Sequence, residues 1–204
     1  MKVLPCGDAA LLIEVGGLPG VLALADAVRA AALPEVLDVV PAARTVLLST
    51  APGTDLAAVR RTVLALPVDA APAASDGDTV EIEVTYDGPD LAEVGRLTGL
   101  GEAGVIEAHT ARPWRVAFGG FAPGFGYLSD GDPRLNVPRR DEPRTTVPAG
   151  SVGLAGEFSG VYPRSSPGGW QLIGRTEAVL WDLDRDPPAL LRPGGRVRFR
   201  QVRP

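Results

Sequence analysis

Very few side chains in this sequence could carry proton-transfer or nucleophilic chemistry. The 204 residues include one histidine (His109), one cysteine (Cys6) and one lysine (Lys2). Imidazole titrates near neutral pH, so His109 is the natural candidate for an acid–base or hydrogen-bonding role. A histidine at the C-terminal end of an expected helix can equally be structural, because its cation suits the helix dipole. The residue type leaves both interpretations open.

The same scarcity excludes several kinds of site. A single cysteine allows neither a disulfide within the chain nor a zinc site built from several cysteines. A P-loop requires Gly-Lys-Ser/Thr, and the sequence does not contain it. Lys2 is a poor candidate for a Schiff base or for biotin attachment. A role with ATP or carboxybiotin would therefore need another geometry, and we expect it to involve another chain.

Backbone amides offer a second kind of chemistry in the stretch 118–176. This stretch contains 12 of the 25 glycines and 7 of the 20 prolines, together with many large apolar residues. Glycine and proline interrupt helices, so the composition favours short strands joined by tight, shaped loops. Loops of this kind expose N–H groups that suit anions and oxyanions.

Three loops in this stretch are candidate binding sites. In GGFAPGFGYL, glycine amides could face a ligand beside an aromatic wall, or the glycines could simply permit a barrel corner. PRTTVPAGS combines a guanidinium suited to carboxylate or phosphate with amides suited to an oxyanion, or it is a surface arginine before an ordinary turn. SSPGGW is either a second anion loop or a hairpin turn. The candidate residues are Gly120, Phe121, Pro123, Gly124, Phe125 and Tyr127 in the first loop, Arg144, Pro148, Ala149, Gly150 and Ser151 in the second, and Ser166, Pro167, Gly168, Gly169 and Trp170 in the third, with Tyr162 between the last two.

The elements before residue 67 are predicted to form a small α/β layer. Strands are expected at 9–15, 36–40 and 45–49 because apolar and β-branched residues cluster there. Helices are expected at 18–33, where Pro19 suits the first turn, and after a cap at Thr54 or Asp55. The order β-α-β-β-α is close to a split-βαβ unit.

Residues 67–78 lack an apolar period and are rich in Ala, Pro, Asp and Gly. We therefore predict that they link two domains, residues 1–75 and residues 79–204.

The second domain is predicted to be mostly β-structure. A strand at 80–86 and helices at 89–98 and 102–109 come first. Further strands are expected at 112–118, 170–176, 177–183 and 196–200. Many short strands separated by Gly/Pro turns indicate a closed or nearly closed barrel, so the predicted fold class is α+β.

Alternating arginines at positions 196, 198 and 200 could form a basic strip for a partner or an anion. A solvated strand face is the alternative interpretation.

Composition narrows the functional class. The chain is 45% hydrophobic and carries a net charge of −5, which argues against non-specific binding to nucleic acid or anionic membranes. No apolar stretch reaches the roughly 18 residues of a transmembrane helix. The first residues lack the pattern of a secretory signal, so a cytoplasmic location is expected.

Several motifs, in the same order, resemble the KipI family, also described as the B subunit of bacterial 5-oxoprolinase or as allophanate hydrolase subunit 1. They are GDAALLIEV, VIEAH, GGFAPGFGYL, PRTTVPAGSVGLAG, GVYP and SSPGGWQLIGRT, and they cover nearly the whole chain. The domain also resembles one half of the carboxyltransferase region of urea carboxylase. The resemblance implies a cyclophilin-like barrel and a pocket role for His109, because the family carries a histidine at the matching position. It departs at Phe158, where the family more usually has Gln, and this leaves the substrate open, while Ser159 keeps a hydroxyl where Thr is common.

The resemblance implies one component of an ATP-dependent 5-oxoprolinase, a lactam hydrolase, with little activity of its own. Its partners would be a KipA-like C subunit and a LamB/YcsF-like A subunit, and the assembly would use ATP to convert 5-oxoproline into glutamate. His109 and Arg144 would be its catalytic residues. Neither a bound metal nor covalent biotin is expected in this chain. The alternatives are an inhibitor of a sensor histidine kinase, and the carboxyltransferase half of a urea carboxylase or allophanate hydrolase system.

Overall fold

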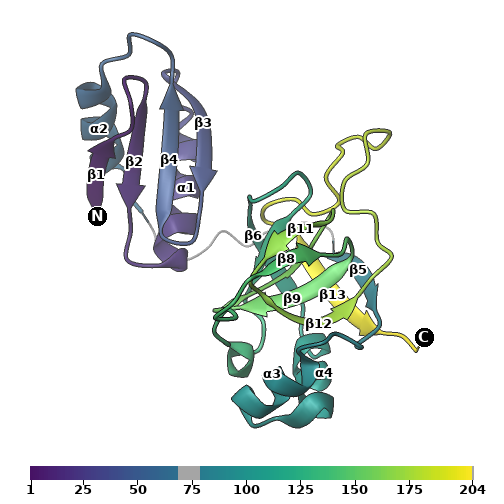
Figure 1. Ribbon diagram of the computed structural model, residues 1–204. Coiled ribbons are helices and arrows are strands. Elements are labelled where there is room, and N and C mark those ends of the chain that lie inside the picture. Colours follow the sequence, from purple (N-terminus) through teal and green to yellow (C-terminus); the bar gives the residue numbers. More distant parts are fainter. Residues whose placement is uncertain (69–78, 204) are drawn as a thin grey trace. The chain divides into compact units, whose positions relative to one another are not determined.

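The computed structural model describes residues 1–68 and 79–203, which form parts of two compact units, Met1–Ala74 and Ser75–Pro204 (Figure 1). Most of the predicted linker at 67–78 lies outside the described residues.

The first unit is a four-stranded antiparallel sheet with two helices. Its strands are β1 (Lys2–Pro5), β2 (Ala10–Glu14), β3 (Val36–Pro41) and β4 (Thr45–Thr50), in the order β1-β2-β4-β3. Both β2 and β3 run antiparallel to β4 on its two sides, so they are parallel to each other with β4 between them. The predicted split-βαβ arrangement is therefore confirmed. Strand β1 was not predicted, because its four residues lie at a half-exposed edge and show no alternation.

The two helices of this unit begin where the sequence signals them. Helix α1 (Leu18–Ala31) starts with Pro19 in its first turn and ends at Ala32, which adopts a left-handed φ of 46°. Helix α2 (Leu56–Ala65) is capped by Asp55, whose Oδ1 accepts hydrogen bonds from the amides of Ala57 at 2.9 Å and Ala58 at 3.1 Å. Their apolar faces bury a core against the sheet, with Ile13, Val21, Leu24, Val46, Leu48 and Val63 among its members.

The second unit is built around a seven-stranded, nearly closed barrel. The strand order is β12-β9-β10-β7-β6-β13-β5, and a bridge between Thr85 and Arg175 joins the ends of the two outermost strands. Strands β8 and β11 form a separate two-stranded sheet. The strands are β5 (Thr79–Val84), β6 (Trp114–Gly119), β7 (Gly126–Ser129), β8 (Arg144–Val147), β9 (Ser151–Ala155), β10 (Phe158–Val161), β11 (Ser166–Gly168), β12 (Gln171–Arg175) and β13 (Arg196–Gln201).

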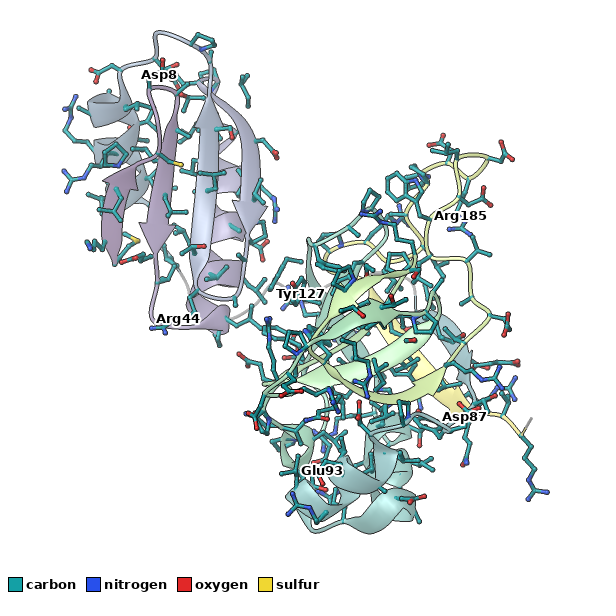
Figure 2. All side chains as sticks on the ribbon, viewed as in Figure 1. Asp8, Arg44, Asp87, Glu93, Tyr127 and Arg185 are labelled. Atoms are coloured by element: carbon teal, nitrogen blue, oxygen red, sulfur yellow. The ribbon has the colours of Figure 1, made fainter. Side chains whose placement is uncertain are left out.

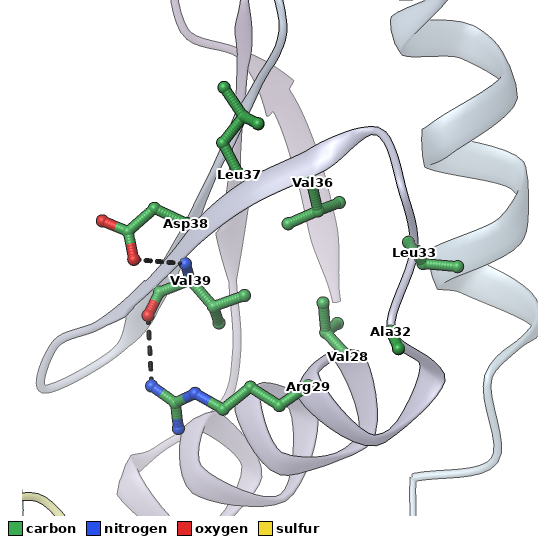
Figure 3. Close-up of a pocket in the computed structure, with 8 residues that line it drawn as sticks. All are labelled: Val28, Arg29, Ala32, Leu33, Val36, Leu37, Asp38 and Val39. Atoms are coloured by element: carbon green, nitrogen blue, oxygen red, sulfur yellow. Dashed lines mark hydrogen bonds between the residues drawn. The ribbon is translucent and has the colours of Figure 1, made fainter.

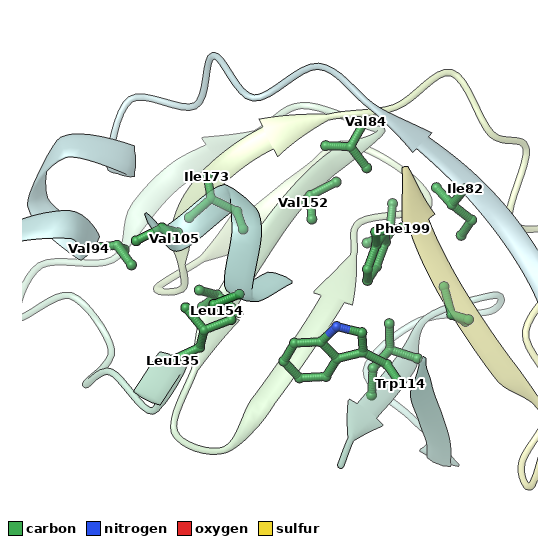
Figure 4. Close-up of a cluster of buried hydrophobic side chains, with 14 of the residues drawn as sticks. Ile82, Val84, Val94, Val105, Trp114, Leu135, Val152, Leu154, Ile173 and Phe199 are labelled. Atoms are coloured by element: carbon green, nitrogen blue, oxygen red, sulfur yellow. The ribbon is translucent and has the colours of Figure 1, made fainter. Parts of the chain in front are cut away.

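Two helices and a buried core complete the second unit. Helices α3 (Leu91–Thr98) and α4 (Gly101–Thr110) pack on each other and against β12 and β13 (Figure 1), and a short 3₁₀ helix, η1, spans Pro133–Leu135. Figure 2 shows Glu93 on α3. Large side chains such as Trp114, Leu154 and Phe199 fill the interior of the barrel (Figure 4). The predicted α+β fold class is confirmed.

The strand predicted at 177–183 is wrong. Only Trp181 forms an isolated bridge, to Ala189, within a long loop between β12 and β13 that also carries Arg185 (Figure 2). Leu180 is buried in the core and its carbonyl accepts from the amide of Leu190 at 2.9 Å. The other apolar residues of the segment, Val179, Trp181 and Leu183, are exposed. One anchored leucine holds the loop, and the apolar letters mimic a strand.

Candidate functional site

Residues from two of the three predicted loops meet around one hollow of about 120 Å³ on the second unit. The Gly120–Tyr127 loop supplies three aromatic side chains, and the segment after β11 supplies two glycines and a tryptophan. The lining residues are Phe121, Phe125, Tyr127, Arg139, Tyr162, Gly168, Gly169 and Trp170. Seven of these eight were predicted as binding residues, and Arg139 was not.

The walls of the hollow are aromatic rings that hold one another in place. The ring of Phe125 lies edge-on to those of Phe121, Tyr127, Tyr162 and Trp170, with centroid distances of 5.3, 5.1, 5.6 and 5.4 Å. Edge-to-face contacts at these distances are favourable and fix ring orientation. The hollow is therefore an apolar slot with one cationic side chain, Arg139, at its border.

The first loop is a tight turn that presents Phe121. Its backbone has a φ of 66°, which is unusual for an aromatic residue, and its side chain is 55% exposed. The turn is closed by Ala122 N–H to the Gly120 carbonyl at 2.7 Å and by Phe125 N–H to the Ala122 carbonyl at 3.0 Å. Local strain of this kind occurs preferentially at ligand-binding sites.

Glycine is required at two positions around the site. Gly124 has a φ of 83°, and a Cβ there would lie 2.9 Å from Cβ of Trp181. A Cβ at Gly168 would lie 2.5 Å from the hydroxyl of Tyr162. Gly120, Gly124 and Pro123 thus shape the first loop, while Gly168 lets the strand pass close to Tyr162. Burial raises the pKa of Tyr162, against a hydrogen bond from the backbone N–H of Trp170.

Arg144 does not line the hollow but lies in an ion cluster nearby. It is paired with Gly168 across the β8–β11 sheet, and its Nη2 donates to Oδ1 of Asp90 at 2.7 Å. The same oxygen accepts from Arg140 at 2.8 Å, and Oδ2 of Asp90 accepts from the amide of Leu172 at 2.7 Å. Burial acts to raise the pKa of Asp90, but the hydrogen bonds and the two guanidinium charges outweigh it and hold the pKa below its usual range.

The second nitrogen of the Arg144 guanidinium has a different environment. Nη1 is buried and has no hydrogen-bond partner among the described residues. Asp90 thus fixes the guanidinium from one side and leaves one donor free.

The oxyanion site expected at Gly150 and Ser151 is not formed by their amides. Gly150 N–H donates to the carbonyl of Tyr162 at 2.8 Å, and Ser151 N–H donates to that of Pro148 at 3.3 Å. A Cβ at Gly150 would lie 2.2 Å from the carbonyl oxygen of Thr176, so glycine serves close packing there. The turn made by Pro148, Ala149 and Gly150 is an architectural feature of the barrel.

Two predicted residues of the third loop also lie outside the hollow. Pro167 is exposed, and Ser166 carries a buried hydroxyl without a partner among the described residues.

His109 lies in the interior of the barrel, with 0% of its surface exposed. Its Nδ1 is 2.7 Å from the hydroxyl of Tyr86 and its Nε2 is 2.8 Å from Oγ of Ser159. Its ring stacks on Phe199 with centroids 4.3 Å apart, and its carbonyl accepts from Nε1 of Trp114 at 3.0 Å. Burial lowers the pKa of His109 to about 3, so the ring is neutral at pH 7. His109 is not among the residues that line the hollow.

Sequence reasoning missed three residues that the structure makes important. Asp90 was assigned only to the start of a helix, and Tyr86 only to a strand. Arg139 stands beside Arg140 in the segment VPRRDEP, between two of the predicted loops. Two adjacent arginines between prolines were the one signal that could have pointed to a cationic border.

The first unit has a larger hollow that contains none of the predicted site residues. It measures about 310 Å³ and lies between α1 and β3 (Figure 3). Arg29 donates to the carbonyl of Val39 at 3.1 Å, and Asp38 accepts from the amide of Val39 at 2.8 Å. Its charged side chains are thus bound to the backbone, which makes it a weaker candidate than the aromatic hollow.

Two further searches concern the described residues alone. Within residues 1–68 and 79–203, no group of three or more His, Cys, Asp or Glu side chains is arranged to hold a metal ion. None of the helices in that part of the chain is long and apolar enough to cross a membrane.

Comparison with known proteins gives consistent relatives. The chain is 54% identical over 123 residues to the 5-oxoprolinase B subunit of Escherichia coli O157:H7, a match covering 59% of this chain and 56% of the relative. The chain spans between 52% and 59% of the length of the curated relatives with that name.

Solved structures show the same fold. A conserved uncharacterised protein from Pyrococcus horikoshii is 35% identical with a TM-score of 0.59, over 99% of this chain and 98% of that one. The urea carboxylase of Kluyveromyces lactis is similar in fold alone, with a TM-score of 0.75 at 19% identity over 98% of this chain and 21% of that chain.

A family model described as carboxyltransferase domain, subdomain C and D, matches residues 1–191. The resemblance to the B subunits of 5-oxoprolinase, inferred from the motifs, is confirmed by relatives at 44–54% identity. The match covers most of the chain and both compact units, so this chain belongs to the family of carboxyltransferase domains with subdomains C and D.

Proposed function

We propose that this chain is the B subunit of an ATP-dependent 5-oxoprolinase, which converts 5-oxoproline into glutamate. A KipA-like C subunit and a LamB/YcsF-like A subunit would complete the enzyme. The observation that carries the proposal is the 44–54% identity to three relatives named as B subunits of 5-oxoprolinase. We also propose that the two compact units are separate domains, at 1–75 and 79–204.

The aromatic hollow suits this substrate. 5-Oxoproline is a small five-membered lactam ring that carries one carboxylate. Ring carbons would pack against Phe125 and Trp170, and the carboxylate would pair with the guanidinium of Arg139. A slot of about 120 Å³ favours a small ring over a long chain.

The lactam is a poor electrophile, and this determines what the protein must supply. Phosphoryl transfer from ATP to the lactam oxygen would activate the ring carbon, and water would then attack it. Fixed donors must hold the negative charge that develops. We propose that the free Nη1 of Arg144 is one of them, because Asp90 orients the guanidinium while leaving that nitrogen unpaired.

His109 has a positioning role in this proposal. Its ring is neutral at pH 7 and bridges Tyr86 and Ser159 inside the barrel, so it fixes strand β10 beneath Tyr162 and does not transfer a proton to substrate. ATP would bind to the assembled enzyme, since the chain has no P-loop.

The test is reconstitution with the two partner subunits, measuring glutamate and ADP formed from 5-oxoproline and ATP. The isolated chain should show little turnover. Arg139→Gln should lower kcat/KM about 10- to 100-fold, mainly through KM, because one charge-assisted hydrogen bond is typically worth about 1.5–3 kcal/mol. The control is Arg60→Gln, an exposed residue of α2 that should keep normal kinetics.

Two results would contradict the proposal. Full activity of the purified chain alone would remove the need for partners. No glutamate from the complete assembly, but carboxylation of urea in the presence of bicarbonate and a biotin carrier, would favour carboxyltransfer, to which the family's description refers.

A further inference from the structure

Four polar residues form a row across the outer face of the barrel. Ser129 on β7 is directly opposite Arg115 on β6, Arg115 is opposite Arg196 on β13, and Arg196 is opposite Thr79 on β5. Directly opposed residues project from the same face of a sheet. Trp114 points into the core (Figure 4), so Arg115, its neighbour in the strand, points away from it.

Two of these residues are buried without partners. Arg115 is 8% exposed and Ser129 is 2% exposed. Nε of Arg115 and Oγ of Ser129 are buried and make no hydrogen bond among the described residues. A buried polar group without a partner is costly, and a buried unpaired charge more so.

The row also places two like charges side by side. Within residues 1–68 and 79–203, neither Arg115 nor Arg196 forms an ion pair. Four residues further along the strand the pattern differs, because Arg200 pairs with both Glu81 and Glu83. Like charges directly opposite each other destabilise a sheet unless an anion neutralises them.

We propose that Arg115, Arg196 and Ser129 form a binding site for a phosphoryl group. A dianion neutralises both guanidinium groups, whereas a single carboxylate would leave one unpaired. Phosphate oxygens also accept hydrogen bonds from planar guanidinium groups and from hydroxyls together. The site is separate from the aromatic hollow, and none of its residues lines that hollow. It does not depend on the proposed reaction, because it can be measured on this chain alone.

The experiment titrates the full chain with inorganic phosphate, pyrophosphate and ATP at constant ionic strength, using calorimetry, with acetate as the carboxylate probe. Phosphate should bind, and acetate should not. Arg196→Gln should weaken phosphate binding about tenfold or more, since a charge-assisted hydrogen bond and one unit charge are lost. Tighter binding of pyrophosphate and ATP than of phosphate supports a nucleotide as the source, and the reverse supports free phosphate.

Arg198→Gln is the matched control. It removes the same charge from the same face of the same strand, at a position opposite Glu81, and should leave affinity nearly unchanged. Arg115→Met gives a second readout. In phosphate-free buffer this variant should be at least as stable as the wild type, because an unpaired buried charge is removed. Phosphate should stabilise the wild type alone.

Several outcomes would overturn the proposal. They are an absence of phosphate binding, equal binding of acetate, and equal weakening by Arg198→Gln and Arg196→Gln. A further one uses Asp76 and Asp78, which precede Thr79 in the sequence. If phosphate binds only after both are changed to Asn, the chain's own carboxylates occupy the site.

Discussion

Mild acid should destabilise the barrel unit through His109. Burial lowers the pKa of this ring to about 3, whereas an unfolded histidine titrates near about 6.5. Below that higher value the unfolded chain binds a proton that the folded chain does not. Stability is therefore fully present above the unfolded pKa and is lost as pH falls toward the folded pKa.

The size of the effect follows from one proton. Each pH unit below about 6.5 should remove about 1.4 kcal/mol of unfolding free energy, or about 2 kcal/mol between pH 7.5 and pH 5. Carboxylates contribute little in this window. The pKa of Asp132, for example, is lowered to about 2 by its hydrogen bonds with Arg134, against some burial, so its contribution is lost only at more acid pH.

The chain is well suited to this measurement. His109 is its one histidine, and its three tryptophans, Trp114, Trp170 and Trp181, all belong to the second unit. Urea unfolding followed by tryptophan fluorescence therefore reports the barrel. The comparison is His109→Gln, which keeps a hydrogen-bonding side chain but cannot titrate.

The variant should differ from the wild type in two ways. At neutral pH it should be less stable by about 1–3 kcal/mol, because Tyr86 and Ser159 lose part of their bridge. Its stability should be nearly flat from about pH 7.5 to pH 5, since no other group titrates strongly there. A wild type equally stable at both ends of that range, or a variant with the same slope, would refute the buried neutral histidine.

Two further predictions concern packing and the ion cluster. Gly150→Ala should destabilise the barrel by about 2–4 kcal/mol, because its φ is 78° and the new Cβ meets the Thr176 carbonyl, whereas Gly156→Ala, with a φ of 57° and open space, should cost only about 1 kcal/mol; equal losses in urea unfolding would contradict the steric argument. Asp90→Asn should cost about 3–5 kcal/mol, because Arg144 loses its buried counter-charge, and the same measurement should show it; a loss below about 1 kcal/mol would mean that water screens the cluster.

Local signals in the sequence were sufficient for most of the fold. Helix starts at Pro19 and Asp55 and the alternation in 80–86 are set by neighbouring residues, so they can be inferred without tertiary contacts. The segment 177–183 had the same apolar letters but no partner strand, and strand pairing depends on residues far away in the chain. Only the structure could separate these cases.

The candidate site was predictable as a set of loops and unpredictable in its details. Glycine and aromatic residues identified the segments that meet at the hollow, because both are needed where backbone approaches a ligand. Which amides remain free depends on distant carbonyls, such as that of Tyr162 for Gly150. The environment of His109 likewise depends on Tyr86 and Ser159, which are 23 and 50 residues away.

Phe158 shows how the barrel tolerates a change in the KipI-like pattern, in which Gln is more usual. Its neighbour Ser159 points inward to His109, so Phe158 projects from the opposite side of β10. There it packs edge-on against Phe118 and Tyr127, with centroids 5.7 and 5.6 Å apart. Phe158 does not line the hollow, but it supports Tyr127, which does. The aromatic ring therefore changes the rigidity of one wall and leaves the polarity of the hollow to Arg139, so the substitution is compatible with an unchanged substrate class.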